Sequence, residues 1–204
     1  MTHKFEALIC AILFTFWSVR LYYKLYDKKI RKYIISIGIL IVFWMLIRMT
    51  KGVVETTLLT RLSWYLYYVP LIFIPSIFYI YSRSLLKKIN KKEKIIIYII
   101  STILLLMVLT NDFHEIVFKF NNGIEDFNNY KHNIGYYLIT LWIFILFGGG
   151  MIILALDRLK IKKDIKAFLP LGILLIGVIY TLLYVININN IRNINMSVVN
   201  SILI

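Results

Sequence analysis

Long apolar runs separated by short basic connections constrain this sequence more than any other feature. A helix needs about 17–25 such residues to cross about 30 Å of hydrocarbon. Runs of this length lie at approximately 5–23, 33–50, 62–82, 95–111, 133–155 and 167–186. Backbone groups in lipid must bond within their own segment, and these runs suit helices better than the roughly ten-residue strands of a barrel. The sequence therefore predicts an all-α, polytopic transmembrane helix bundle that occupies residues 1–204 as one domain.

Composition and charge agree with a bilayer environment. Hydrophobic residues occupy 60% of the 204 positions, above the usual share of about 45–50% in soluble domains. The net charge of +14 is carried by the connections between the apolar runs, so the expected partner is anionic lipid on the cytoplasmic side and not nucleic acid. The single cysteine, Cys10, lies in the first run and can form neither an intramolecular disulfide nor a multi-cysteine metal site. That run lacks a small-residue cleavage pattern, so we expect it to be retained as a span.

The distribution of lysine and arginine predicts the orientation. Three connections are rich in these residues, namely 24–32, 83–94 and 157–166, and they alternate with connections that are poorer in them. The positive-inside rule assigns the three rich connections to the cytoplasmic side. We therefore expect a multi-pass protein of the cell membrane with an extracytoplasmic N-terminus, and with the 112–132 connection on the same outer side.

The last residues, SVVNSILI (197–204), begin an apolar run but are too few to span a bilayer. Six spans would leave this end of the chain on the outer side. We interpret it as the start of a seventh helix, either in a truncated gene product or in a domain of a longer protein. A short surface-bound tail would have the same sequence character.

The stretch RLSWYLYYVPLIFIP concentrates aromatic residues at the outer end of the third run, and two interpretations of it are open. In the first, Trp64, Tyr65 and Tyr68 belong to the aromatic belt that membrane proteins place at the headgroup level. In the second, Arg61 precedes Trp64 and Tyr65 at helical spacing, which allows cation–π contact and an aromatic-lined mouth for a ligand.

Two prolines follow these aromatic residues within the same run. Pro70 and Pro75 each remove a hydrogen bond from a helix interior, so we expect the third span to bend near Pro70 to Pro75. Such a bend would present Trp64 and Tyr65 toward the outer mouth. Prolines are common in membrane helices, so they do not by themselves distinguish a hinge from an ordinary span.

The stretch LTNDFHEIVF ends the fourth run with polar residues and also has two interpretations. In the first, Asp112 and Glu115 form a capping box, and the apolar spacing predicts a short interfacial helix over 113–120. In the second, Asn111, His114 and Glu115 share one helical face and offer an amide, an imidazole and a carboxylate to a ligand.

The charge of this stretch leads to a prediction about contacts. An unpaired carboxylate in hydrocarbon costs about 2.5–3.5 kcal/mol on insertion scales, so the acidic groups must lie at the surface or find partners. In the predicted topology, Arg48 and Arg61 lie in a connection on the same outer side as these acidic groups. We therefore expect Asp112 or Glu115 to approach one of these arginines, with an aromatic residue of the third run nearby.

No motif for catalysis or for a cofactor is recognisable in the sequence. It contains no HExxH, no Walker-type loop and no pattern typical of a Ser-His-Asp triad. His114 has no second histidine at ligand spacing, so we expect no metal site. The glycines at 148–150 lie within a span and indicate close helix packing or a flexible point rather than phosphate binding. The sequence therefore predicts a protein that is not an enzyme.

The two unusual stretches (61–75 and 109–120), followed by IGYYLITLWIF (134–144), resemble the N-terminal seven-transmembrane-helix region of bacterial membrane-bound sensor histidine kinases. The likeness covers about residues 1–200. The matching residues are Arg61, Trp64, Tyr65, Tyr67, Tyr68, Pro70, Pro75, Asn111, Asp112, His114, Phe118, Tyr136 and Tyr137. The resemblance implies a sensory or membrane-anchoring input whose signalling domain would follow on the cytoplasmic side. Here six of the family's seven spans are complete and no kinase sequence is present, so we expect an input module without its output.

The leading hypothesis is therefore a sensory module that responds to an unknown extracytoplasmic or membrane-borne ligand and acts on a signalling partner or as a homo-oligomer. Its candidate ligand or sensing residues are Arg61, Trp64, Tyr65, Tyr68, Asn111, Asp112, His114 and Glu115. The alternative is a small membrane carrier or substrate-binding membrane subunit, which would place ionisable or broken-helix features near the middle of the membrane. A membrane enzyme would need a cluster of catalytic groups at one interface, and only the outer acidic loop offers one.

Overall fold

The computed structural model describes residues 2–24, 27–50, 57–86, 89–120 and 130–161. The chain divides into two compact units, 1–150 and 151–204. The first unit holds both of the unusual stretches. The assignment of residues 1–204 to one domain stays a prediction.

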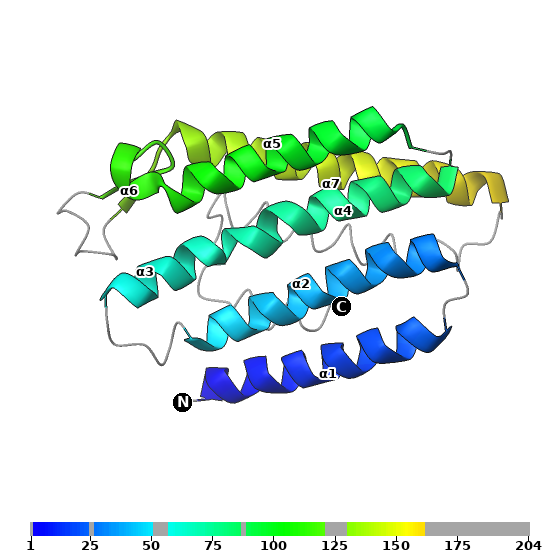
Figure 1. The fold of residues 1–204 in the computed structure, drawn as a ribbon, viewed down its shortest axis with the longest axis horizontal. Coiled ribbons are helices and arrows are strands. Elements are labelled where there is room, and N and C mark those ends of the chain that lie inside the picture. The colour runs from blue at the N-terminus through cyan, green and yellow to red at the C-terminus, as the bar shows by residue number, and fades with distance from the viewer. Residues whose placement is uncertain (1, 25–26, 51–56, 87–88, 121–129, 162–204) are drawn as a thin grey trace, which may run out of the picture. The chain divides into compact units, whose positions relative to one another are not determined.

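Helices make up most of the described residues (Figure 1). They are α1 (Thr2–Lys24), α2 (Lys28–Thr50), α3 (Thr57–Leu66), α4 (Tyr68–Leu86), α5 (Lys91–Leu109), α6 (Asn111–His114) and α7 (Ile134–Ile161). Between α6 and α7 lie two short strands, β1 (Phe118–Phe120) and β2 (Tyr130–His132).

Three stretches of the described residues are long and apolar enough to cross a membrane, namely Ile30–Met49, Leu59–Leu85 and Ile134–Leu156. They lie at the second, third and fifth predicted spans. Helices α1 and α5 occupy the first and fourth predicted spans, and the sixth, 167–186, lies outside the described residues. The mostly helical, membrane-spanning class is thus confirmed, whereas six complete spans stay a prediction.

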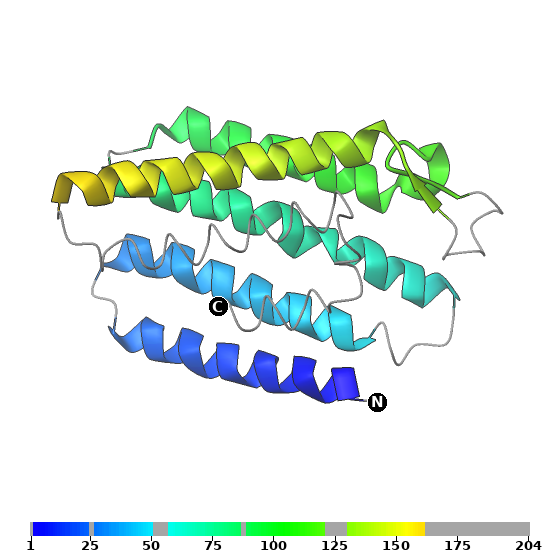
Figure 2. The ribbon, with the colours of Figure 1, turned by 180° about the vertical axis from the view of Figure 1, so that it is seen from behind.

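Successive spans run antiparallel, with α3 and α4 following one another in the same span (Figure 1, Figure 2). Helix α1 packs on α2, α2 packs on α3 and α4, and α4 packs on α5. Helix α7 lies against α4 and α5, because Phe147 stacks on Phe78 with ring centroids 5.0 Å apart and Trp142 donates a hydrogen bond to Ser101. One end of this bundle therefore carries α3, α6 and the strands, and the other carries the end of α4 and the start of α5.

The third span is interrupted at Tyr67, which separates α3 from α4. Pro70 explains the position, since a proline ring collides with the carbonyl four residues earlier, and that carbonyl belongs to Leu66, the last residue of α3. Helix α4 continues through Pro75 without a break. The break therefore lies just before Pro70, at the start of the Pro70–Pro75 stretch near which a bend was predicted, and none lies at Pro75.

The predicted interfacial helix over 113–120 is wrong, and two strands of three residues each accompany the helices of this mostly helical fold. Helix α6 stops after His114, because Glu115 has a left-handed backbone with φ 50°. Strand β1 then pairs antiparallel with β2, in the register Phe118 to His132 and Phe120 to Tyr130. A small β-hairpin thus covers this end of the bundle.

The glycines at 148–150 show close packing at two of their three positions. A Cβ atom on Gly150 would lie 2.8 Å from the ring of Phe78, and one on Gly149 would lie 3.1 Å from Tyr79. A Cβ atom on Gly148 would meet nothing within 4 Å. The sequence-based expectation of a close helix approach is confirmed here for α7 on α4.

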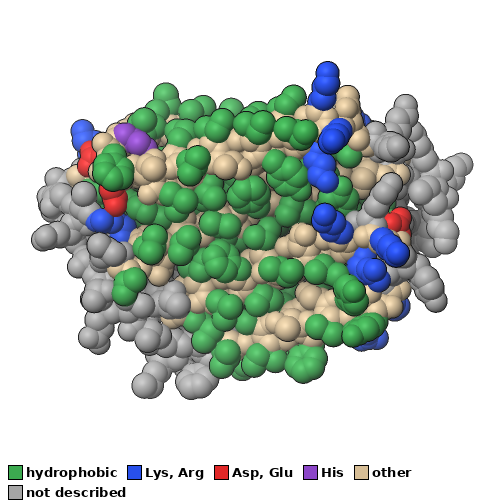
Figure 3. Space-filling view, viewed as in Figure 1, with side chains coloured by type: hydrophobic (Ala, Val, Ile, Leu, Met, Phe, Trp, Pro, Cys, Tyr) green, Lys and Arg blue, Asp and Glu red, His purple; other side chains and the backbone are tan. Residues whose placement is uncertain are grey.

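Apolar side chains cover much of the face in Figure 3, while Lys and Arg gather at the end where α4 stops and α5 begins. On α5 the exposed apolar residues include Ile99, Ile103 and Leu106. In a membrane-spanning chain such surfaces face lipid tails, so burial inside the protein is not required of them.

Candidate functional site

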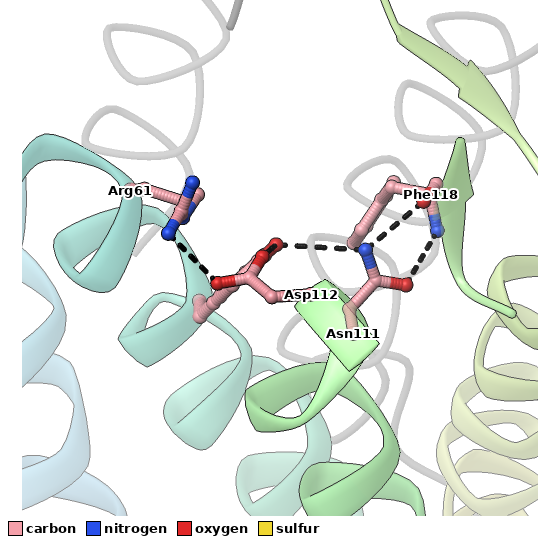
Figure 4. Close-up of polar contacts among 5 residues, drawn as sticks. Arg61, Asn111, Asp112 and Phe118 are labelled. Atoms are coloured by element: carbon pink, nitrogen blue, oxygen red, sulfur yellow. Dashed lines mark hydrogen bonds and ion pairs between the residues drawn. The ribbon is translucent and has the colours of Figure 1, made fainter. Parts of the chain in front are cut away.

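Asn111, in the first turn after α5, is fully buried. Its Oδ1 accepts hydrogen bonds from the backbone N–H groups of Val117 and Phe118, both at 2.9 Å. Its Nδ2 donates to the Phe118 carbonyl at 2.9 Å and to the Tyr65 hydroxyl at 3.5 Å (Figure 4). A primary amide makes about four hydrogen bonds, so Asn111 uses its whole capacity inside the protein and is not available to a ligand.

These bonds also explain why the helix stops. In a continuing α-helix the N–H of Val117 would bond to the carbonyl of Phe113, four residues earlier. Here the Asn111 side chain takes that donor. The short polar side chain thus replaces helix bonds by side-chain bonds, which is the usual way asparagine competes with helical structure.

Asp112 joins α6 to α3. Its Oδ2 lies 2.9 Å from Nη2 of Arg61, and its Oδ1 accepts a hydrogen bond of 2.5 Å from the Tyr65 hydroxyl (Figure 4). Arg61 and Tyr65 are one helical turn apart on α3, so both face the same side. The Arg61 and Asp112 side chains keep 17% and 26% of their surface exposed. The expected contact between a carboxylate of LTNDFHEIVF and an arginine is therefore present, with Asp112 and Arg61 as the partners.

Trp64 and Tyr68 pack under the hairpin. The ring centroid of Trp64 lies 4.3 Å from that of Phe118 and 4.9 Å from that of Tyr130, and Tyr68 contacts Phe118 at 5.6 Å. Tyr68 is buried and Trp64 is half-buried. These aromatic residues form the core beneath the hairpin, which neither the belt nor the open-mouth interpretation described.

His114 and Glu115 play local roles among the described contacts. The Nδ1 atom of His114 accepts a hydrogen bond from the N–H of Ile116, so Nε2 carries the proton and bonds to the Thr110 hydroxyl at 3.1 Å. The carbonyl of Glu115 accepts a hydrogen bond from the Asn133 side chain. The three residues once expected on one polar face are thus separated, since Asn111 points inward while His114 bonds within its own turn.

The family model described as the N-terminal 7TM region of histidine kinase matches residues 7–203. The chain belongs to this family. The resemblance based on the aromatic and Asn-Asp-x-His stretches is thereby confirmed, and the family describes a membrane region rather than a catalytic domain. The chain matches no curated protein and no solved structure.

The start of α7 in this 7TM region bonds to the segment between α6 and β1, a contact that the sequence-based prediction missed. The N–H of Asn133 bonds to the Val117 carbonyl, and the N–H of Gly135 bonds to the Ile116 carbonyl at 2.9 Å. A Cβ atom on Gly135 would lie 2.9 Å from that same oxygen. The sequence feature that could have indicated this helix start is an asparagine directly before an apolar run. The side chain of Asn133 accepts a hydrogen bond from the N–H of Ile134.

A second missed feature is a buried polar chain in the middle of the 7TM region. Trp142 on α7 donates to the Ser101 hydroxyl on α5 at 3.1 Å, Ser101 and Ser76 on α4 are 2.8 Å apart, and Ser76 donates to the Ile72 carbonyl. Ser76 and Ser101 are fully buried. The residues lay in runs that read as purely apolar, so only the helix packing could reveal the chain.

The side chains at the contact between α3 and α6 bind one another and fix the position of the two helices. Within the described residues, no group of three or more His, Cys, Asp or Glu side chains could hold a metal ion. We call the set Arg61, Tyr65, Asn111 and Asp112 the α3–α6 junction. It holds two spans together by charge-assisted bonds, which are stronger than neutral ones.

Proposed function

We propose that this chain is a sensory input region in which the α3–α6 junction responds to a stimulus on the extracytoplasmic side. The observation that carries the proposal is the bond set of Asp112, which ties the start of the third span to the end of the fourth. A stimulus that changes this contact changes how two spans meet.

The extracytoplasmic assignment rests on charge. Lys and Arg side chains gather at the opposite end of the bundle, where α4 ends and α5 begins (Figure 3). The positive-inside rule places that end in the cytoplasm, where anionic lipid is its proposed partner. The N-terminus and the hairpin then lie outside.

The junction has a route to the cytoplasmic end. The third and fourth spans are bonded at three depths. At the hairpin end, Arg61 and Tyr65 on α3 bond to Asp112 on α6. In the middle Ser76 on α4 bonds to Ser101 on α5, and at the far end Arg83 on α4 pairs with Glu93 on α5. Because packed helices move as rigid elements, a shift at one end is carried along the pair.

A chimera tests the proposal. The chain is joined to a histidine kinase catalytic region, and autophosphorylation is measured with membrane insertion as a parallel readout. We expect Asp112→Ala to change kinase output severalfold while insertion is preserved. Glu115→Ala is the matched control, since its described contact is made by its backbone carbonyl. Equal loss of output and insertion in Asp112→Ala, or equal effects of the two variants, would point to a structural role alone.

A membrane carrier is the second candidate function, and the polar groups in the middle of the bundle fit it less well than they fit a sensory region. The polar groups there, Ser76, Ser101 and Trp142, carry no charge and bond to one another. The helix interruption at Tyr67 lies toward the end of the third span. Transport assays in vesicles with the same chimera would distinguish the two functions, since only a carrier accumulates a solute.

A further inference from the structure

Two stripes run along α5 and continue into α6. The buried stripe consists of Ile97, Ser101, Leu104, Val108 and Asn111. The exposed stripe consists of Ile99, Ile103, Leu106, Thr110 and Phe113. Both follow the three- and four-residue spacing of one helix. Helix α6 therefore extends the two faces of α5, with Asn111 at the end of the protein-facing stripe and Phe113 at the end of the lipid-facing one.

Phe113 is the most exposed large hydrophobic side chain among the described residues, at 90%. It directly follows Asp112 in the same four-residue turn. Asn111 and Asp112 bond inward to β1 and α3, whereas Phe113 points away from the protein. A displacement of the Phe113 backbone therefore displaces the turn that carries Asn111 and Asp112.

The length of the helix places Phe113 at the edge of the hydrocarbon layer. Lys92, near the start of α5, and Phe113 are separated by about 31 Å of helix at about 1.5 Å per residue. A bilayer has a hydrocarbon core of about 30 Å. With Lys92 at one surface, the Phe113 ring reaches the opposite interface, where the structure leaves it exposed.

The neighbouring surface on α7 is also apolar. Ile134 and Tyr137, in the first turn of α7, are 64% and 62% exposed. They lie close to the segment that follows α6, since Gly135 bonds to the Ile116 carbonyl. Exposed apolar side chains of α6 and α7 therefore lie at the same end of the bundle.

We propose that Phe113 inserts into the bilayer interface and that lipid is the partner that positions α6, so the hydrophobic thickness of the membrane acts on the α3–α6 junction. This inference rests on the proposed function of that junction. A bilayer that is thinner or thicker than the distance from Lys92 to Phe113 imposes a mismatch, which costs fractions of a kcal/mol per Å. Tilting α5 or shifting α6 relieves it, and α6 carries Asp112.

A depth measurement tests the insertion. Spin labels are attached to single cysteines in a Cys10→Ser background, at F113C, at I103C in the lipid-facing stripe and at K119C on the exposed face of β1. We expect the F113C label to be shielded from a water-soluble relaxation agent and to lie shallower than the I103C label. A label at F113C as accessible to water as the one at K119C would overturn the inference.

A distance measurement tests the effect on the junction. Labels at L62C on α3 and K119C on β1 are measured by pulsed dipolar spectroscopy in nanodiscs of phosphatidylcholines with short, intermediate and long acyl chains. We expect the distance to shift steadily with chain length, the shift to be lost in F113A, and F113W to retain it. Leu106→Ala, one heptad earlier on the same stripe, is the control and should retain the shift.

Two further outcomes, both from the distance measurement, would overturn the inference: no dependence on chain length with Phe113 present, or the same dependence in F113A as in L106A. Neither measurement uses kinase output. A junction that ignores bilayer thickness would therefore leave the proposed sensory function standing, while an Asp112→Ala chimera with normal output would remove that function and leave the insertion of Phe113 standing.

Discussion

The third and fourth spans carry an ion pair between an arginine and a carboxylate at each of their two ends, but the surroundings of the two pairs differ. At the hairpin end, Arg61 and Asp112 are 17% and 26% exposed, and Tyr65 adds a second bond to the carboxylate. At the other end, Arg83 bonds to both oxygens of Glu93 at 3.2 and 3.4 Å, and Tyr79 adds a longer bond of 3.5 Å. Here 37% and 30% of the Arg83 and Glu93 side chains are exposed, and no buried amide side chain like that of Asn111 is described beside the pair.

The difference shows what a surrounding network adds to an ion pair. Beside Asp112, the buried Asn111 holds the backbone of β1, so the geometry of the hairpin end is fixed from several sides. An exposed pair such as Arg83 and Glu93 contributes about 0–1 kcal/mol and is screened by salt. Substitutions at the hairpin end should therefore cost more stability than substitutions at the other end, where the pair is more exposed.

The largest expected effect is on stability, and it differs between the alanine variants of Asn111 and Asn90. Asn111→Ala leaves the N–H groups of Val117 and Phe118 without their partner, so we expect a loss of about 3–5 kcal/mol in the free energy of unfolding. Asn90→Ala removes only the exposed cap of α5, whose side chain accepts from the N–H of Lys92, and should cost about 0.5–2 kcal/mol. Denaturant unfolding in micelles measures both; equal losses would contradict the comparison.

A glycine pair tests the close approach of α7 at the hairpin end. Gly135→Ala places a methyl group 2.9 Å from the Ile116 carbonyl, a backbone atom that cannot rotate away, and should cost about 1–3 kcal/mol. Gly148→Ala meets nothing within 4 Å and should be neutral or stabilising by up to about 1 kcal/mol. Thermal unfolding of the two variants would show the contrast, and a stable Gly135→Ala protein would argue against the fixed contact.

A smaller effect is expected from the Tyr65 hydroxyl. Tyr65→Phe keeps the buried ring but removes the bonds to Asp112 and Asn111, so we expect a loss of about 1–2 kcal/mol. Tyr137→Phe, at a position that is exposed toward lipid, serves as the control and should change stability little. If both variants behave alike, the hydroxyl bond does not contribute to the junction.

The smallest effect is expected at the far end. Glu93→Gln should cost less than about 1 kcal/mol, and the cost should disappear at high salt because the pair is partly exposed. Asp112→Asn, measured under the same conditions, should keep most of its cost at high salt. Salt-dependent unfolding of both variants would sharpen the comparison, and an equally salt-sensitive Asp112→Asn protein would weaken it.

The sequence could predict the Arg61–Asp112 contact because few alternatives exist for a carboxylate at the end of an apolar run. Charge is costly in hydrocarbon, and in the predicted topology few arginines lie on the same side of the membrane as Asp112. The second, third and fifth spans follow from run length alone. These features depend on single residues or on composition, which a sequence displays directly.

The sequence did not predict the hairpin, because the apolar spacing over 113–120 fits a helix. The competing signal was the alternation of Phe118, Lys119 and Phe120, whose burial follows a strand pattern. What decides between the two is the side chain of Asn111, and its partners are backbone groups of residues further along the chain. Nearly every residue has the same backbone groups, so the sequence does not show which of them bond to a given side chain.

A double-mutant cycle on Arg61 and Asp112 tests the central claim most directly. The unfolding free energies of Arg61→Met, Asp112→Asn and the double variant are compared with that of the unmodified chain in micelles. If the pair joins α3 to α6 as described, the two effects will not add, and the interaction energy will be about 1–3 kcal/mol. Additivity within about 0.5 kcal/mol would contradict the account, because the two spans would then be held together without this contact.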